Sequence, residues 1–208
     1  MKLKILSWNV CGLHEKDKRF RIRNLLKLWR PHIICFLETK LELITRGIVR
    51  NIWGSHHLDW VYLGSNGASG GILLMWDTRV VEKVEEAVGI FSISCKFRSV
   101  FDSQEWMFSG VYGPQFDGER LLMWEELACI SSWWGVPWCL GRHFNVIQFP
   151  SEKLGGQHFT QAMVGFSDFL FSCGLLDTPL EGGRQQVYIY IYIYTWSNSR
   201  YIYIKYVY

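Results

Sequence analysis

Short apolar runs and an amphipathic stretch follow one another at the start of the chain, and their order predicts a layered α/β fold. Residues 3–10 and 32–37 are mostly apolar and have the length of buried strands. Residues 19–30 carry apolar side chains at helical spacing with arginine and lysine between them, and Pro31 ends that helix. Polar residues come directly after each strand, which is where layered α/β folds place their ligand sites.

The middle of the chain is rich in predicted strands. Residues 59–63, 71–76, 80–86, 90–97 and 106–112 are apolar or alternate between apolar and polar side chains. Consecutive strands separated by turn signals indicate antiparallel pairing. Helices at 119–134 and 161–173 and a strand at 137–141 complete the pattern. The glycine-rich segment 64–71 lacks the Gly-Lys-Ser/Thr of a phosphate-binding loop, so we interpret it as a tight connection into a strand.

The C-terminal part of the sequence has a different character. Residues 188–194 alternate strictly between tyrosine and isoleucine, and the alternation returns at residues 201–204. An alternating T/A stretch of DNA read in frame encodes this pattern, and no fold requires it. We predict an incomplete globular domain over residues 1–186 and a low-complexity tail over residues 187–208. Period two and high β propensity favour a makeshift strand in this tail, and the same features make it an aggregation hazard.

Composition excludes several classes of protein. With 208 residues, 49% hydrophobic and 20% charged, the chain suits one globular domain and not a disordered segment. It has neither the ~20 apolar residues of a membrane span nor an apolar signal-peptide core, so we expect a nuclear or cytoplasmic protein without a membrane contact. The net charge of +3 permits a nucleic-acid partner without requiring one. Six scattered cysteines predict buried, reduced thiols rather than disulfides or zinc ligands.

Four polar residues stand at the ends of predicted strands: Asn9, Glu38, Tyr112 and Asn145. Each alone has an ordinary structural explanation as a turn, solvated or packing residue. With their neighbours they form ordered motifs, which are Ser7-Trp8-Asn9-Val10, Leu37-Glu38-Thr39-Lys40, Val111-Tyr112-Gly113-Pro114, Phe144-Asn145-Val146 and Thr195-Trp196-Ser197-Asn198. This set resembles the endonuclease/exonuclease/phosphatase family. Segments 67–76 and 149–153 look, more narrowly, like the endonuclease domain of plant non-LTR (LINE-type) retrotransposons.

The resemblance implies a four-layer α/β sandwich, in which two packed, mainly antiparallel sheets are flanked by helices and the last strands are missing or replaced by the Tyr/Ile tract. It implies hydrolysis of a DNA phosphodiester with Mg²⁺, or with Mn²⁺ in its place. Glu38 would bind the metal with Asn9 beside it, because a hard cation prefers oxygen ligands. Tyr112 would contact the scissile phosphate, and Asn145 would orient water or stabilise charge on phosphorus. No obligate protein partner is implied.

The sequence departs from the family pattern at two places. Members of the family have Gly-Gly-Asp-Phe-Asn where this chain has Gly141-Arg142-His143-Phe144-Asn145, so His143 occupies the position of the aspartate. A neutral histidine brings one acceptor and no charge to a metal, and a protonated histidine brings the wrong sign. The family also continues to an Arg-x-Asp segment and a terminal Ser-Asp-His, where this chain has the Tyr/Ile tract.

These departures predict a degenerate, C-terminally truncated endonuclease domain with weakened metal binding and impaired or absent catalysis, in other words a pseudoenzyme. His143 would be a poor substitute in the catalytic role. Arg142, Thr195 and Trp196 are expected to bind DNA, weakly. Two alternatives stay open at this point. The chain is a nucleic-acid-binding remnant without catalysis, or it is an open-reading-frame product without a function.

Overall fold

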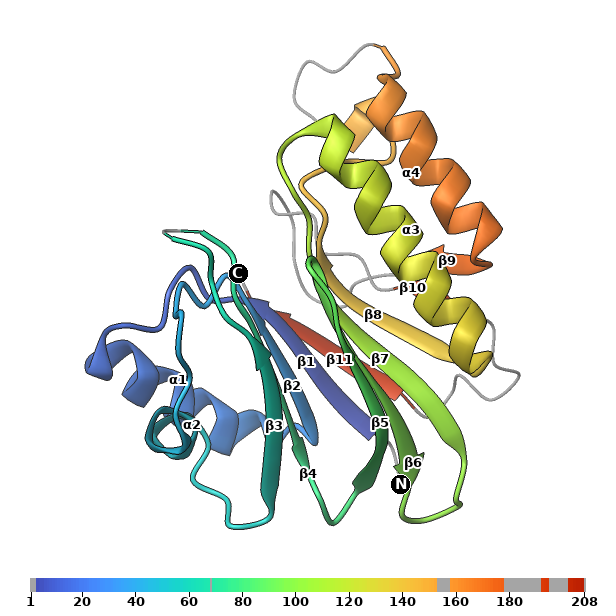
Figure 1. The fold of residues 1–208 in the computed structure, drawn as a ribbon. Helices are drawn as coiled ribbons and strands as arrows, with labels where there is room; N and C mark the ends of the chain where they lie inside the picture. Colours follow the sequence, from blue (N-terminus) through green and yellow to red (C-terminus); the bar gives the residue numbers. More distant parts are fainter. Residues whose placement is uncertain (1–2, 68, 153–157, 178–191, 195–201, 208) are drawn as a thin grey trace.

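The computed structural model describes residues 3–67, 69–152, 158–177, 192–194 and 202–207. Strands and helices follow one another along these residues, as Figure 1 shows. The elements are β1 (Leu3–Asn9), α1 (Lys16–Trp29), β2 (Ile33–Leu37), α2 (Arg46–Ile52), β3 (Leu58–Leu63), β4 (Ile72–Asp77), β5 (Val81–Val88), β6 (Ser92–Ser99), β7 (Glu105–Tyr112), α3 (Asp117–Trp134), β8 (Trp138–His143), η1 (Pro150–Glu152), α4 (Gln161–Ser172), β9 (Leu175–Asp177), β10 (Tyr192–Tyr194) and β11 (Ile202–Val207).

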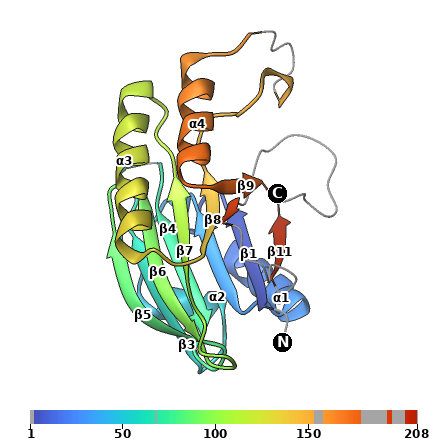
Figure 2. The same ribbon diagram turned by 90° about the vertical axis from the view of Figure 1, so that its right-hand side faces the viewer.

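Two sheets pack face to face, and helices cover the outer face of each (Figures 1 and 2). One sheet has the strand order β11-β1-β2-β4-β3, and the other has the order β5-β6-β7-β8-β10-β9. β1 runs parallel to β2 and β11, and β7 runs parallel to β8, while the other pairings are antiparallel. The predicted four-layer α/β sandwich is therefore confirmed.

Parts of the Tyr/Ile tract join both sheets. β10 lies between β8 and β9, and β11 pairs with β1 from Leu3 opposite Ile202 to Trp8 opposite Val207. The expected makeshift strand is thus present in two short pieces. The boundary between a domain over residues 1–186 and a tail over residues 187–208 stays a prediction, because residues 178–191 and 195–201 lie outside the described part of the chain.

The core between the sheets changes in side-chain volume along the strands. Trp76, Phe97 and Trp106 fill the end at which β7 begins. The ring of Phe97 lies 5.3 Å from the ring of Trp76 and 5.5 Å from the ring of Trp106, measured between centroids. Aromatic pairs at such distances contribute to stability beyond the area that they bury.

Two glycines occupy the other end of this core, where β7 and β8 finish. Gly110 and Gly141 are partners in the β7–β8 pairing. A Cβ atom on Gly110 would lie 2.5 Å from Cys35 Sγ, and one on Gly141 would lie 2.7 Å from Ser7 Oγ. These contacts are too short for real atoms, so the facing sheet leaves no room for a side chain at either position. The two sheets approach each other closely at this end.

The helices bury their apolar sides on the outer faces of the sheets. α1 and α2 pack on the five-stranded sheet, and α3 and α4 pack on the six-stranded sheet (Figures 1 and 2). The sequence did not predict α2, which begins at the Thr45 cap, where the Thr45 hydroxyl accepts the Ile48 N–H at 3.4 Å. Among the described residues, every helix is too short or too polar to cross a lipid bilayer.

All six cysteines are unpaired thiols, as predicted. Cys35, Cys95 and Cys139 are buried between the sheets, and burial raises the pKa of each thiol. Cys11 and Cys129 are exposed, so the expectation of burial was wrong for these two. The reason is position, because Cys11 follows the end of a strand and Cys129 lies on the outer side of α3.

An ion pair closes the end of β4. Arg79 Nε donates to Asp77 Oδ1 at 2.9 Å, Arg79 Nη2 donates to Asp77 Oδ2 at 2.6 Å, and the Arg79 backbone N–H adds a third hydrogen bond. The hydrogen bonds from the guanidinium hold the pKa of Asp77 below its ordinary value, although burial acts in the opposite direction. A carboxyl with a depressed pKa in the folded state stabilises the fold at neutral pH, and this stability is lost as the pH falls through that pKa.

Replacing Asp77 with asparagine is therefore expected to lower the melting temperature by roughly 3 °C at pH 7. The difference from the unmodified protein should begin to shrink as the pH falls below about 4 and should reach zero only below the depressed pKa of the folded state, where the carboxyl is protonated in both states. Thermal unfolding of both proteins between pH 7 and pH 3 measures the effect. Asp168→Asn, on the exposed side of α4, is the control. A difference that persists unchanged in acid would contradict the assigned role of the ion pair.

Candidate active site

The polar residues that end the parallel strands converge at one edge of the sandwich. Asn9 ends β1 and Glu38 follows β2, while Tyr112 ends β7 and His143 ends β8. Because the strands within each pair are parallel, their carboxyl ends lie side by side. Each sheet thus contributes one half of a shared site, and the charges of the two halves affect each other.

Glu38 is the centre of the first half. Its Oε2 accepts a hydrogen bond from Asn9 Nδ2 at 3.0 Å, and its Oε1 lies 3.0 Å from Lys40 Nζ. Burial alone would raise the pKa of Glu38, but the hydrogen bonds from Asn9 and Lys40 outweigh it and hold the pKa below its ordinary value. The side chain is 18% exposed. At neutral pH it is therefore a fixed anion at the mouth of the site.

Tyr112 and His143 form the second half. Their rings stack with centroids 5.6 Å apart and an angle of 27° between the planes. Burial and the negative charge of Glu38 raise the pKa of Tyr112, while a hydrogen bond with Asn145 and the charge of Lys40 act in the other direction. The phenol is therefore protonated at neutral pH and can donate a hydrogen bond to a phosphate oxygen.

A network of hydrogen bonds fixes the loops that follow β7 and β8. The Gly113 N–H donates to the His143 carbonyl at 2.6 Å, and Asn145 Nδ2 donates to the Gly113 carbonyl at 2.6 Å. Arg120 on α3 donates to the carbonyls of both loops, to Pro114 at 3.3 Å and to Asn145 at 2.9 Å. Arg120 therefore holds the backbone of Asn145 in place from α3. No pattern in the sequence indicates this role.

Backbone strain is concentrated at the same edge. Six non-glycine residues of the described chain have a positive φ, and four of them are at the site: Cys11 (47°), Glu38 (57°), Lys40 (56°) and Asn145 (54°). Left-handed conformations are unfavourable for residues with a Cβ and persist only where the surroundings impose them. The strain gives the polar side chains directions that an ordinary strand end does not provide.

The structure brings together Asn9, Glu38, Tyr112, His143 and Asn145, as the sequence led us to expect, and their chemical roles stay predictions. The backbone of Arg142 pairs with Val111, but its side chain is not described, and Thr195 and Trp196 lie outside the described residues. Sequence reasoning missed two further neighbours. Lys40 binds Glu38, and the Cys11 thiol lies 3.3 Å from Asn9 Oδ1. Lys40 is in the same motif as Glu38 and Cys11 follows the motif of Asn9, and this nearness along the chain was the only available signal.

The donor types at the first half fit a hard divalent cation. Glu38 offers carboxylate oxygens and Asn9 an amide oxygen. Two features make the fit a weak one. Lys40 already neutralises Glu38, and no group of three or more His, Cys, Asp or Glu side chains that could hold a metal is found within the described residues. Asp168 does not help, because it is exposed on α4.

A groove of about 570 Å³ opens beside Tyr112. Its walls are the glycine-rich connection between β3 and β4, the connection between β5 and β6, and the loop that leads from β7 into α3. The glycine-rich connection is the predicted tight turn, and it is fixed to the site by two hydrogen bonds, from Thr39 N–H to the Gly71 carbonyl and from Lys40 N–H to the Gly70 carbonyl, both at 3.0 Å. None of the described residues that line the groove is lysine or arginine.

Comparison with known proteins places this arrangement among solved structures. No family model and no curated protein sequence matches the chain. The human Nocturnin catalytic domain with a bound sulfate anion is 12% identical with a TM-score of 0.66, and the match covers 93% of this chain and 83% of that one. An endonuclease/exonuclease/phosphatase family protein from Bacteroides thetaiotaomicron is 13% identical with a TM-score of 0.64, at 93% and 83% coverage.

The chain has the endonuclease/exonuclease/phosphatase fold. The AP endonuclease LMAP from Leishmania major is a further structure of this kind, at 14% identity and a TM-score of 0.62, with 89% of this chain and 77% of that one covered. At such sequence identities the structural similarity shows the fold of this chain and not its activity.

Proposed function

We propose that the chain is a retrotransposon-derived, Mg²⁺-dependent phosphodiesterase domain of the DNA endonuclease type, in which catalysis is impaired. The observation that carries the proposal is the convergence of an anionic Glu38, held by Asn9, with Tyr112 and Asn145 at the carboxyl ends of strands from both sheets. The AP endonuclease among the similar structures supports a DNA substrate.

The chain's own residues would divide the work in the following way. Glu38 and Asn9 would hold Mg²⁺, which when bound supplies charge stabilisation at a phosphoryl group. Tyr112 would donate its phenol hydrogen to a phosphate oxygen, because its raised pKa keeps that proton in place. Asn145 would present its amide beside the same phosphate, since Arg120 donates to its backbone carbonyl and its side-chain Nδ2 donates to the Gly113 carbonyl.

Two residues near Glu38 support the proposed impairment. His143 brings no negative charge, and Lys40 competes with a metal for the one anionic group of the described site. General-base assistance typically contributes ~10²–10⁴-fold in rate, so a histidine that replaces an aspartate costs on that order. The retrotransposon origin rests on the motif segments 67–76 and 149–153, and the Tyr/Ile tract in place of the family's last motifs supports decay.

Replacing Glu38 with glutamine tests the metal site directly. In the unmodified protein we expect Mg²⁺ or Mn²⁺ to raise the melting temperature slightly, by mass action on the folded state. Glu38→Gln should abolish this shift, because an amide keeps the shape of the side chain and removes the charge that binds the cation. Differential scanning fluorimetry with increasing metal measures it. Glu119→Gln, in the first turn of α3, should leave the shift unchanged.

An incision assay and a DNA-binding assay distinguish between a phosphodiesterase, a nucleic-acid-binding remnant and a product without a function. Purified protein, abasic-site duplex and supercoiled plasmid are incubated with each metal, and we expect at most traces of metal-dependent nicking. Vigorous nicking that disappears in Glu38→Gln would overturn the impairment and keep the phosphodiesterase. Fluorescence anisotropy with labelled duplex tests the nucleic-acid-binding remnant, for which binding without metal and with strong salt dependence is expected. If the metal does not raise the melting temperature and the protein does not bind DNA, the remaining hypothesis is an open-reading-frame product without a function.

A further inference from the structure

A second pocket lies at the opposite end of the five-stranded sheet from the candidate active site. It has a volume of about 490 Å³, within the usual range for small-ligand sites. Its walls are α1, the connection between α2 and β3, the start of β2 and the end of β4. The five residues of β2 separate His32 in this pocket from Glu38, a distance of about 20 Å along the strand. We call it the basic pocket, after Arg23, Lys27, Arg30 and Arg79 in its walls.

Three cations in this pocket have no anionic partner among the residues that the structure describes. Arg23, Lys27 and Arg30 follow one another at helical spacing along α1 and its C-cap, and none of them forms an ion pair within the described residues. The one carboxylate in the lining, Asp77, is already bound in bidentate fashion by Arg79. Like charges at this spacing repel one another, so a bound anion would relieve a cost.

The position of Arg23 distinguishes the pocket from an ordinary solvated helix face. The negative end of the helix dipole explains basic residues in the last turn, but Arg23 lies in the middle of α1. Its guanidinium is pressed against Gly54, where an added Cβ would lie 2.4 Å from Arg23 Nη2. The Nε atom is buried and has no hydrogen-bond partner among the described residues, so a ligand in the pocket would be met by the other N–H groups of the guanidinium.

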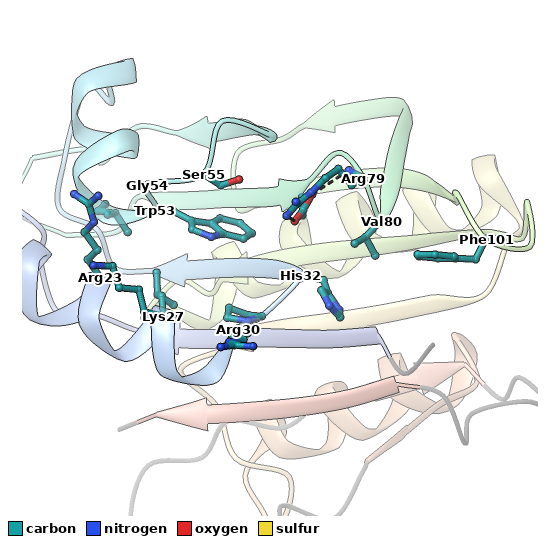
Figure 3. A pocket seen from close by; sticks show the side chains of 14 residues that line it. Arg23, Lys27, Arg30, His32, Trp53, Gly54, Ser55, Arg79, Val80 and Phe101 are labelled. Carbon is teal, nitrogen blue, oxygen red and sulfur yellow. Dashed lines mark hydrogen bonds and ion pairs between the residues drawn. The ribbon is translucent and has the colours of Figure 1, made fainter.

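An aromatic ring completes the site. Figure 3 shows Arg23, Lys27, Arg30 and Arg79 around the half-buried indole of Trp53. A flat ring beside several cations is the combination that binds a nucleobase by stacking and its phosphates by charge. We propose that the basic pocket binds a nucleoside diphosphate, with its phosphates on Arg23, Lys27 and Arg30 and its base on Trp53. The proposal is independent of the phosphodiesterase function.

Isothermal titration of the full chain at low salt tests the site with two probes, ADP and inorganic pyrophosphate. We expect both to bind and ADP to bind at least about fivefold more tightly, because only ADP carries a base that can stack. Added salt should weaken both, since the cations are partly exposed. Trp53→Leu should remove the advantage of ADP and leave pyrophosphate unchanged.

Charge reversal on α1 provides a matched pair of variants. Lys27 and Arg21 are both exposed on this helix, but only Lys27 lines the pocket. Lys27→Glu should weaken both probes by about tenfold or more, and Arg21→Glu should change either by less than about twofold. Melting temperatures of both variants confirm that they fold.

Three results would overturn the nucleotide site. The first is no binding of either probe at millimolar concentration. The second is equal weakening in Lys27→Glu and Arg21→Glu, which would indicate general attraction to a basic protein. The third is an unchanged advantage of ADP in Trp53→Leu. Glu38→Gln should bind ADP as tightly as the unmodified protein, because Glu38 lies outside the basic pocket. This test therefore does not depend on the active-site proposal. A loss of ADP binding in Glu38→Gln would contradict the assignment of the nucleotide to the basic pocket.

Discussion

Replacing His143 with aspartate is expected to raise the affinity of the site for Mg²⁺ by about tenfold or more. His143 lies close enough to Glu38 for its charge to affect the pKa of that carboxyl, so an aspartate there would add a second negative charge near the carboxylate of Glu38. The affinity of hard cations rises with the number of charged ligands. Isothermal titration with Mg²⁺ and Mn²⁺ measures the change.

His143→Asn is the control for this result. It offers an amide oxygen of similar size without the charge, so it should leave the Mg²⁺ affinity within about threefold of the unmodified protein. Without metal, His143→Asp should be slightly less stable than His143→Asn, because two carboxylates then repel each other. Equal metal affinity in the two variants would show that the missing charge at this position is not what weakens the site.

The rate of incision should respond less than the metal affinity does. We expect His143→Asp to nick abasic-site duplex faster than the unmodified protein and still slowly, because Lys40 would continue to pair with Glu38 and to compete with the metal. A vigorous nuclease from this one change would mean that this competition matters little.

Replacing Gly113 with alanine is expected to lower the free energy of unfolding by about 3 kcal/mol. A Cβ atom at this position would lie 2.3 Å from the Phe144 carbonyl oxygen and 2.7 Å from its Cα. Backbone atoms cannot rotate away as a flexible side chain can, so the ends of β7 and β8 must separate. The hydrogen bonds from Gly113 N–H to His143 and from Asn145 to Gly113 would lengthen with them.

Gly118→Ala is the matched control, because nothing lies within 4 Å of a Cβ there. Gly118 is in the first turn of α3, where alanine favours the helix, so this variant should be as stable as the unmodified protein or slightly more stable. Urea unfolding of the three proteins gives the comparison. A cost below about 0.5 kcal/mol for Gly113→Ala would mean that the strand ends move apart easily and that the site is not rigid.

Much of the fold could be predicted because the sandwich separates its side chains with regular periods. β2 and β4 each send alternate residues to the inner core and to the helix-facing core, and the apolar positions of the longer helices recur at helical spacing. The seven-residue α2 is too short to show a helical period, and Gly47 in its first turn weakens its propensity. The partners of β8, β9 and β10 depend on contacts between segments far apart in the sequence.

The candidate site could be predicted in its main members for a related reason. Residues directly after parallel strands meet at one edge whatever the loops do, and Asn9, Glu38 and Tyr112 depend on nothing more. Lys40 and Cys11 reach Glu38 and Asn9 through left-handed backbone at Cys11, Glu38 and Lys40, which no residue type in that stretch signals. Arg120 acts from a helix that the sequence relates to the site only through the fold.

The glycines between the sheets have an evolutionary consequence. Gly110 and Gly141 carry no reactive group, yet they set how near the half of the site on one sheet comes to the half on the other. A single methyl group at either position would act as a spacer and pull Glu38 away from Tyr112 while every residue of the active site remained unchanged. A domain of this fold can therefore lose the geometry of its site through a substitution at Gly110, which lies outside every motif named above, while all the motif residues are kept.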